Sequence, residues 1–581
     1  MKFSLRFPAT AASLATRAQR RRSLLLACAG IAVLPLAWHG VSCGQDFDFH
    51  FASWLEVLRH WHEGVLYPHW DASANYGAGE PRFVFYPPLS WMLGALLGAV
   101  LPWDWTQLAF TLIALLALGA SFFAMAREWM PKDNAAFAAC LCVLNPYILF
   151  VAYERTACGE LLGAACIPLL ILFGLRKQAS ILPLSLTIAA MWLTNAPTAV
   201  MGCYALAVLV LVSAIEQRSP ALVLRSLAAV PLGLGLAAFY LVPAVYEQRW
   251  VEIARAIGPD MRVEDSFLFG HTADPYHNQV LRTASLIAVA LLLATAVAAW
   301  RSRTRTAETK RSPIWLPASV LAVLIAVLQF RISDFLWRLA PELKFLQFPW
   351  RWLLLLGVLF ALFAGLALRS EATTRRAISL RALFMLLLAC GFTWLSSARF
   401  WQSCDDQDNV HAQMATLDNG GFEGTDEYTP HEVDNDSIQQ DLPQVRVLRS
   451  VDAEEGDDST TQNPEYQAVA ASEVPASVHI ERWQTERIDL TITAPQAGYA
   501  VLRLLDYPAW RILLNGKHVL SPALRPDGLV TLPVSAGENR IDIRYGTTAD
   551  VWVGRGISIT ALAVLLVLAA LRKKEEKVQV S

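Results

Sequence analysis

Acidic residues first appear just beyond the first long apolar segment, in the stretch CGQDFDFH, residues 43 to 50. Asp46 and Asp48 stand two positions apart, and His50 follows them. On an extended strand two such side chains point to the same side, so the carboxylates could share a divalent metal such as Mg²⁺ or Mn²⁺. Either aspartate could instead cap the helix that we expect to follow. A D-x-D pair is a weak motif, so its chemistry depends on what lies around it.

A second acidic group occupies the stretch YERTACGE, residues 153 to 160, at the end of a later apolar segment. Glu154 and Glu160 could join the two aspartates in one catalytic site, in which a carboxylate takes a proton from an acceptor hydroxyl. For Arg155 alone, termination of a helix is the simpler explanation. The two acidic groups belong together only if they lie on the same side of the membrane.

Arginines elsewhere in the chain could hold the anionic part of a substrate. Arg351 in FLQFPWRW stands at the start of an apolar segment, and guanidinium groups bind phosphate through paired hydrogen bonds. Arg82 and Glu80 are the charged residues of a turn-rich, aromatic stretch from 69 to 88. We take these residues as candidates for contacting substrate: Glu80, Arg82, Arg155, Arg351, His50 and Asp265.

The composition indicates the class of protein that positions these side chains. Of the 581 residues, 55% are hydrophobic and only 17% are charged. Soluble proteins carry about 25% charged residues, whereas uncharged stretches of about 20 residues can cross a membrane. The sequence therefore predicts an α-helical polytopic membrane protein with a soluble portion attached. The net charge of −2 says nothing about nucleic acid, and no basic stripe indicates it as a partner.

Basic loops set the predicted topology, because connections rich in Lys and Arg stay cytoplasmic. Twelve apolar segments place every clearly basic loop and both termini inside. A further apolar segment, 84–102, would invert all later loops, and Pro87-Pro88 disfavours a continuous helix there. We predict that 84–102 is re-entrant or lies on the surface, within a first outer loop of residues 42–104. The predicted spans are 24–41, 105–126, 134–152, 159–175, 180–195, 197–215, 222–243, 283–300, 314–330, 350–368, 379–395 and 554–571.

The residues after the first aspartates, 49–64, have an apolar side that includes Trp54 and a polar side that includes Glu56 and His60. This pattern predicts an amphipathic helix lying in the membrane interface. Three cysteines, Cys43, Cys158 and Cys404, fall in outer segments by this topology. No spacing motif selects a pair among them, so a disulfide there stays open.

The C-terminal part divides into an acidic linker and a compact domain. Residues 396–473 are acidic and poor in aliphatic residues, which predicts an extracytoplasmic linker. From 474 to 553 short alternating stretches such as RIDLTIT and RIDIRY are separated by turn residues, which predicts an antiparallel β-sandwich. The other predicted units are a cytoplasmic N-terminus (1–23), a transmembrane domain (24–395), a last transmembrane helix (554–571) and a cytoplasmic tail (572–581).

The DFD after the first span, the long first outer loop, the second acidic loop YERTACGE and the outer β-rich domain resemble the GT-C superfamily of membrane glycosyltransferases. More closely, the stretches CGQDFDFHFASWLEVLRHWHEG, FVFYPPLSWMLGALLG, LTNAPTAVM and QFPWRW are similar to bacterial membrane proteins labelled "6-pyruvoyl-tetrahydropterin synthase-related". The stretches DYPAWRILLNGK and AGENRIDIRY are similar to YfhO-type proteins. The resemblance covers most of the chain except the acidic linker.

The GT-C resemblance implies a GT-C-like transmembrane domain, in which we count about twelve spans, and a sugar donor linked to a polyprenyl phosphate. It also implies that Asp46 or Asp48 activates the acceptor or binds a metal. The pterin label implies no such activity here, because the sequence offers no compact zinc site of histidines on strands.

Together these patterns predict a glycosyltransferase in the bacterial cytoplasmic (inner) membrane. It would pass a sugar from a lipid-linked donor to an envelope glycan, lipid or protein at the outer face. The alternatives are a non-catalytic transporter or flippase, or an assembly factor for lipid-linked glycans. In a transporter we would expect ionisable residues near the middle of the membrane. The predicted spans are nearly free of charge while the outer loops are not, which favours the enzyme.

Overall fold

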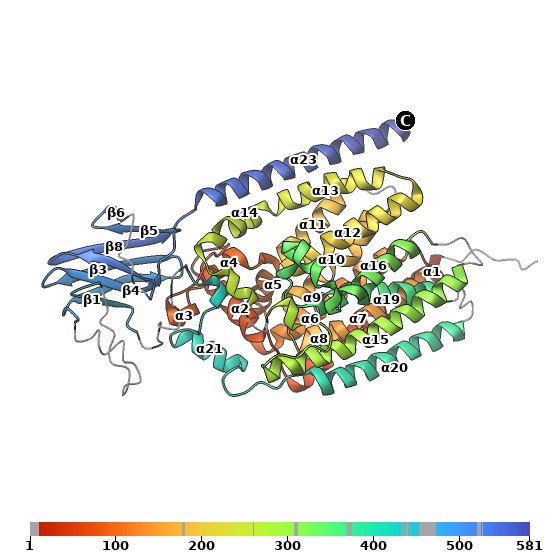
Figure 1. Cartoon of the computed structure of the whole chain (residues 1–581), viewed down its shortest axis with the longest axis horizontal. Helices are drawn as coiled ribbons and strands as arrows, with labels where there is room; N and C mark the ends of the chain where they lie inside the picture. Colours follow the sequence, from red (N-terminus) through yellow and green to blue (C-terminus); the bar gives the residue numbers. More distant parts are fainter. Residues whose placement is uncertain are drawn as a thin grey trace, which may run out of the picture.

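The computed structural model consists of a long helical bundle with a β domain at one end (Figure 1). It describes residues 11–176, 180–258, 261–306, 312–368, 375–431, 433, 435, 438, 440, 442–451, 472–519, 525 and 527–580. The helix α1 begins, and the last helix α23 ends, at the end of the bundle away from the β domain (Figure 1). The predicted tail, 572–581, continues α23 up to residue 580.

The helices follow the apolar segments of the sequence. They are α1 Ala11–His39, α2 Phe47–His62, α3 Ala74–Gly77, α4 Arg82–Phe85, α5 Pro88–Gly98, α6 Trp103–Ala126, α7 Lys132–Val143, α8 Pro146–Tyr153, α9 Cys158–Gly163, α10 Cys166–Leu175, α11 Ile181–Thr194, α12 Ala196–Gln217, α13 Ala221–Leu236, α14 Ala238–Glu247, α15 Pro275–Thr306, α16 Trp315–Leu328, α17 Asp334–Leu339, α18 Pro341–Lys344, α19 Leu353–Ala367, α20 Arg375–Phe400, α21 Val410–Asp418 and α23 Ala549–Val580. Single 3₁₀ turns occupy Gln248–Trp250, Ile253–Ile257, Val263–Asp265, Arg331–Ser333, Pro349–Trp352 and Asp426–Tyr428.

Each of the twelve predicted spans coincides with helical structure, but not all are straight and full-length. Among the described residues, nine helices are long and apolar enough to cross a membrane, and two bent pairs bring the number to as many as 11. The pair α13–α14 bends by 74°, and α16 with the helix after it bends by 101°. The remaining predicted span is α11, which has only 14 residues.

The segment 84–102 forms no span of its own. Its helix α5 has 11 residues and is therefore about 16 Å long, roughly half of a hydrocarbon core. It packs against α2 in the first outer loop. This agrees with the prediction that 84–102 does not cross the membrane as a continuous helix.

The helix α2 differs from the prediction of an interfacial helix. The side chains of Glu56 and His60, on its expected polar side, are completely buried. Its apolar side packs on α5 and on Phe110 of α6, while the polar side meets residues 71–73 and the turn at Thr485-Glu486. Protein thus covers most of α2, including part of the side expected to be polar, although Arg59 and His62 stay exposed.

The β domain is a sandwich of two antiparallel sheets. One sheet has the order β1-β4-β7 and the other β2-β3-β8-β5-β6. Apolar side chains from both sheets fill a common core, as the alternation in sequence predicts. The strands are β1 Val445–Leu448, β2 Ser477–Gln484, β3 Arg487–Ala494, β4 Gly498–Leu505, β5 Trp510–Leu514, β6 Lys517–Val519, β7 Leu529–Val534 and β8 Gly537–Tyr545.

The predicted boundaries of the linker and the sandwich are wrong at three places. The helix α20 runs on to Phe400, and α21 and β1 both fall within 396–473. The strand β1 belongs to the sandwich because it pairs with β4. At the other end α23 begins at Ala549 rather than at 554. The acidic residues 452–471 of the predicted linker lie outside the described residues.

Candidate functional site

The stretch that carries Asp46 lies directly along the break between α8 and α9. The backbone amide of Gln45 donates to the carbonyl of Glu154 at 3.0 Å, and that of Asp46 donates to the carbonyl of Arg155 at 2.9 Å. A Cβ atom on Gly44 would lie 2.3 Å from the Glu154 carbonyl oxygen. Only glycine permits this approach, and the two acidic segments of the sequence are thereby brought together.

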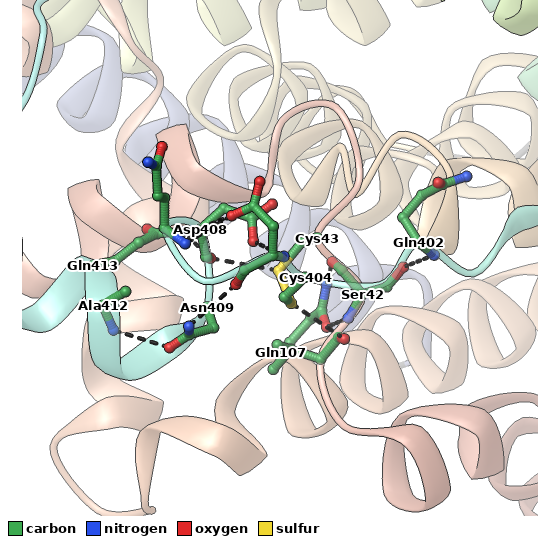
Figure 2. The surroundings of a disulfide bond; sticks show 12 residues. Ser42, Cys43, Gln107, Gln402, Cys404, Asp408, Asn409, Ala412 and Gln413 are labelled. Carbon is green, nitrogen blue, oxygen red and sulfur yellow. Dashed lines mark hydrogen bonds between the residues drawn. A yellow bond between two sulfur atoms is a disulfide. The ribbon is translucent and has the colours of Figure 1, made fainter.

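A disulfide between Cys43 and Cys404 closes the other side of this stretch (Figure 2). It joins the end of the segment after α1 to the segment after α20, with the two Cα atoms 5.0 Å apart. The third outer cysteine, Cys158, is free and buried in α9. The structure thus selects one of the pairings that the sequence left open.

The region of the disulfide also bears on the metal prediction. Within the described part of the chain, the group that brings three potential metal ligands within 4.8 Å comprises Cys43, Cys404 and Asp408. Because both sulfur atoms are joined in the disulfide, they are not available as thiolate ligands. Neither Asp46 nor Asp48 belongs to this group.

Four charged side chains form a continuous chain of ion pairs, which we call the ionic cluster. Nη2 of Arg155 lies 3.2 Å from Oδ2 of Asp46, and its Nη1 lies 2.8 Å from Oε2 of Glu160. The same Glu160 oxygen lies 3.6 Å from Nε of Arg351. The other oxygen of Glu160 accepts a hydrogen bond of 2.6 Å from the hydroxyl of Tyr147. Two acids and two arginines thus alternate at the α8–α9 break.

Burial differs along the ionic cluster. Arg155 and Glu160 are buried, and both Glu160 oxygens are engaged, whereas the side chain of Asp46 is 32% exposed. Burial alone would lower the pKa of Arg155, but the carboxylates of Asp46 and Glu160 raise it overall. Arg155 therefore stays charged and orients Asp46, which keeps one carboxylate oxygen for another partner.

Arg351 is the incompletely paired member of the ionic cluster. Its Nη1 donates to the carbonyl of Leu346, and its Nε is buried with no hydrogen-bond partner among the described residues. The 3₁₀ turn Pro349–Trp352 places Arg351 at the start of α19, and its guanidinium lies 5.0 Å from the ring centre of Phe348. A buried guanidinium N–H without an acceptor is costly, so it is suited to receive an anionic oxygen.

His50 supports the cluster as a neutral ring. Its Nε2 accepts a hydrogen bond of 3.1 Å from the amide of Cys158, which ties α2 to the start of α9. Burial lowers its pKa to about 4, against the opposing charge of Asp46. The imidazole therefore carries no charge at neutral pH and holds the backbone rather than an anion.

Arg82 lies in a separate group, the Arg82 cluster, formed with Glu80 and Asp71. Its Nε is 2.7 Å from Glu80 and 3.2 Å from Asp71, and all three side chains are buried. Burial raises the pKa of Asp71 to about 8, the Arg82 charge opposes this rise, and neighbouring acids add to it. The hydroxyl groups of Ser53 and Thr425 accept hydrogen bonds from the other guanidinium N–H groups of Arg82. With these partners Arg82 has little capacity left for a substrate phosphate.

The other predicted site residues lie apart from the ionic cluster or brace it. Asp48 is exposed on the first turn of α2, where its carboxylate accepts from the amide of Phe49. Asp46 occupies the N-cap position of α2 but makes no capping hydrogen bond with its side chain. Glu154 accepts from the side chain of Gln402 at 2.7 Å. Asp265 pairs with Arg262 at 3.0 Å in an exposed turn.

Sequence reasoning missed Tyr147 and Gln402. Tyr147 sits inside an apolar segment, and Gln402 lies within the predicted linker, so neither residue stood out. The one available signal for Tyr147 was its spacing of 13 residues from Glu160 across a break in the helix.

Comparisons with known proteins agree with a membrane protein. A family model described as "6-pyruvoyl-tetrahydropterin synthase related domain; membrane protein" matches residues 83–400. No curated protein matches the sequence.

Comparison with solved structures finds matches of low sequence identity and low TM-score. A structure of arabinofuranosyltransferase AftD from Mycobacteria shares 16% identity and a TM-score of 0.42, over 66% of this chain and 27% of that one. The apo oligosaccharyltransferase of Archaeoglobus fulgidus shares 13% identity and a TM-score of 0.41, over 67% of this chain and 57% of that one. Its complex with Zn and sulfate gives a TM-score of 0.30 at 16% identity, over 66% of this chain and 54% of that one. The chain thus spans less than two thirds of the length of each.

Proposed function

This chain belongs to the 6-pyruvoyl-tetrahydropterin synthase related family of membrane proteins, and from its ionic cluster we propose that it is a glycosyltransferase. The donor is a sugar linked to a polyprenyl phosphate, and the acceptor is a glycan, lipid or protein of the cell envelope. The reaction takes place at the outer face of the bacterial cytoplasmic membrane. Both termini lie in the cytoplasm, which is supported by the arginines of α1 at the end of the bundle opposite the β domain (Figure 1).

The observation that carries this proposal is the buried Nε of Arg351, which lies 3.6 Å from Glu160 but has no hydrogen-bond partner among the described residues. Arg351 receives the phosphate of the donor, where a guanidinium can make charge-assisted hydrogen bonds. Asp46 takes the proton of the acceptor hydroxyl, because it is the partly exposed acid of the cluster.

Transfer then proceeds by direct displacement. The acceptor oxygen forms a bond to the anomeric carbon as its proton passes to Asp46. The bond from that carbon to the phosphate oxygen breaks, and the electron pair leaves with the polyprenyl phosphate, which Arg351 stabilises. Arg155 and Glu160 are positioning residues, since both are buried and paired with one another.

A divalent metal shared by Asp46 and Asp48 does not fit this site. Asp46 stands at the N-cap position of α2 without a capping bond from its side chain, and Asp48 lies on the first turn, so the pair is not on an extended strand. The carboxylate of Asp46 pairs with Arg155 and that of Asp48 accepts from the amide of Phe49, so each carboxylate is oriented by a different partner. We therefore assign no step to a metal at this pair.

The direct test is transfer by the purified chain in lipid nanodiscs, with a panel of labelled polyprenyl-phosphate sugars and envelope extracts as acceptors. The variant Arg351→Gln should raise the KM for the donor or lower kcat by about 10²-fold, and Arg351→Lys should recover part of the loss. Arg338→Gln, which removes an exposed charge paired with Asp334, is the matched control.

Three results would refute the enzyme. They are equal transfer by Arg351→Gln, no transfer with any donor, and movement of the lipid-linked sugar across vesicles without bond cleavage. The last of these would establish the transporter, the alternative class for this chain. The scarcity of charge within the spans disfavours that alternative.

A further inference from the structure

The outer face of the five-stranded sheet carries arginines that stand side by side across three strands. Arg487 of β3 is paired in register with Arg544 of β8, and Arg544 is paired with Arg511 of β5. Their neighbours along the strands, Ile488 and Ile543, point inward and are buried in the core of the sandwich. We call these three arginines the arginine row.

Such a row is unfavourable without an anionic partner. Directly opposed side chains in a sheet have Cβ atoms about 5 Å apart, and like charges there destabilise the pairing. Arg487 pairs with Asp489 at 3.0 Å, and Arg544 pairs with Asp542 at 3.0 Å. These two acids relieve only part of the repulsion.

The remaining charges of the face do not supply the missing balance. Arg482 shares Asp489 with Arg487, at 3.5 Å, and Arg540 lies 3.9 Å from Glu481. Arg511 is exposed, donates to the carbonyl of Thr547 at 3.1 Å, and forms no ion pair with a described acid. The face therefore has five arginines against four acids, which are Glu481, Asp489, Glu538 and Asp542.

The arginine row includes Arg544, near the end of β8 from which the apolar helix α23 departs. Arg544 precedes the first residue of α23, Ala549, by only five positions, a reach of at most about 18 Å. On α23, Trp552 is 63% exposed and the guanidinium of Arg555 lies 5.5 Å from its ring centre. Exposed Trp with Arg is typical of the level of lipid headgroups. Figure 1 shows α23 leaving the β domain beside β5 and β8.

We propose that the arginine row binds the phosphates of anionic phospholipids around the outer end of α23, and so docks the β domain on the membrane surface. The charge of the row complements such headgroups, and the short connection from Arg544 to α23 keeps the row near the outer end of that helix. The proposal concerns a surface outside the ionic cluster and does not depend on sugar transfer.

The test uses the full chain in two kinds of nanodisc, phosphatidylcholine alone and phosphatidylcholine with about one third phosphatidylglycerol. Hydrogen exchange of peptides covering β5 and the end of β8 is measured in each. We expect several-fold slower exchange in the anionic discs, and loss of this difference in 0.5 M salt, because salt screens exposed charges.

Two double variants distinguish an effect of the arginine row from an effect of the total positive charge on this face. Arg511→Gln with Arg544→Gln should abolish the difference between the discs. Arg482→Gln with Arg540→Gln removes the same charge from the same face, farther along the strands. Most of the difference in hydrogen exchange between the two discs should remain in this variant. Unchanged far-UV circular dichroism shows that each variant is folded.

Three outcomes overturn the proposal. The first is equal exchange in both kinds of disc, and the second is an equal loss in the two double variants. The third is protection in neutral discs by an added anionic glycan but not by phosphatidylglycerol, which would make the row a glycan-binding surface.

Discussion

The carboxylate of Asp46 lies 3.2 Å from the guanidinium of Arg155, although the two residues are 109 positions apart in the chain. The contact joins the first outer segment to the break between α8 and α9. It also connects Asp46 through Glu160 to Arg351. The proposed base is therefore oriented by a buried charge that belongs to a different part of the fold.

The first prediction concerns the proposed base. Asp46→Asn should keep the fold and lower the rate of sugar transfer by about 10²–10⁴, the usual contribution of a general base. Asn can still accept a hydrogen bond from Arg155, so the cluster geometry survives. Asp48→Asn is the comparison, because this residue is outside the ionic cluster, and its effect on the rate should be much smaller. A larger loss in Asp48→Asn than in Asp46→Asn would move the assignment to Asp48.

The second prediction concerns the stability that Arg155 provides. Arg155→Gln leaves Glu160 and Asp46 without their shared cation, and removal of one partner from a buried ion pair costs about 3–5 kcal/mol. Thermal unfolding in detergent should show this as a clear decrease in melting temperature. Arg338→Gln should change it little, because its pair with Asp334 is exposed. If Arg155→Gln and Arg338→Gln have the same melting temperature, the ionic cluster does not stabilise the fold.

The third prediction concerns the disulfide. Mass spectrometry without reductant should find the peptides of Cys43 and Cys404 linked, and reductant should lower the unfolding free energy by about 2–5 kcal/mol. In the variant Cys43→Ser with Cys404→Ser, reductant should have no effect. Alkylation of both cysteines without reductant would show free thiols, and would favour metal binding together with Asp408.

The fourth prediction concerns pH and His50. Its pKa falls from the usual 6.5 to about 4 in the folded chain, mainly through burial. Between these values the unfolded chain binds the extra proton, so the contribution of His50 is complete above pH 6.5 and is lost as the pH falls toward 4. The difference corresponds to about 3 kcal/mol.

Melting temperatures between pH 7.5 and 5 test this directly, with His50→Gln as the matched variant. Glutamine can still accept the amide of Cys158 but does not titrate. The stability of the variant should fall less steeply with pH, and identical slopes would contradict the burial of a neutral imidazole.

The local parts of the architecture could be predicted from sequence. Each predicted span coincides with helical structure, because an apolar run of sufficient length predicts a membrane helix without any information from the rest of the chain. The strands from Ser477 to Tyr545 follow from alternation in the same way. The edge strand β1 was missed because four residues beside an acidic stretch carry too little pattern, and its identity comes from pairing with β4.

The site could be predicted only in part, because its contacts are long-range. The sequence brought Asp46, Glu154, Glu160 and Arg351 to one face, but it offered Arg155 as a helix end or a substrate contact and not as the cation between two acids. Nothing near Arg155 in the chain indicates that two acids surround it. For Arg82 the reverse holds, since Glu80 lies two positions away and Asp71 completes the pairing through an isolated β-bridge between Asp71 and Glu80.

The disulfide has a consequence for biosynthesis. Cys43 is translated 361 residues before Cys404, a delay of roughly 20–70 s at 5–20 residues per second. Throughout that interval the first cysteine is a thiol without its partner, and the helices from α2 to α20 must be inserted before the bond can close. Maturation of the segment that carries Asp46 therefore ends with the synthesis of the residues after α20. A chain that stops short of Cys404 would leave Cys43 open to oxidants and to the thiols of other proteins.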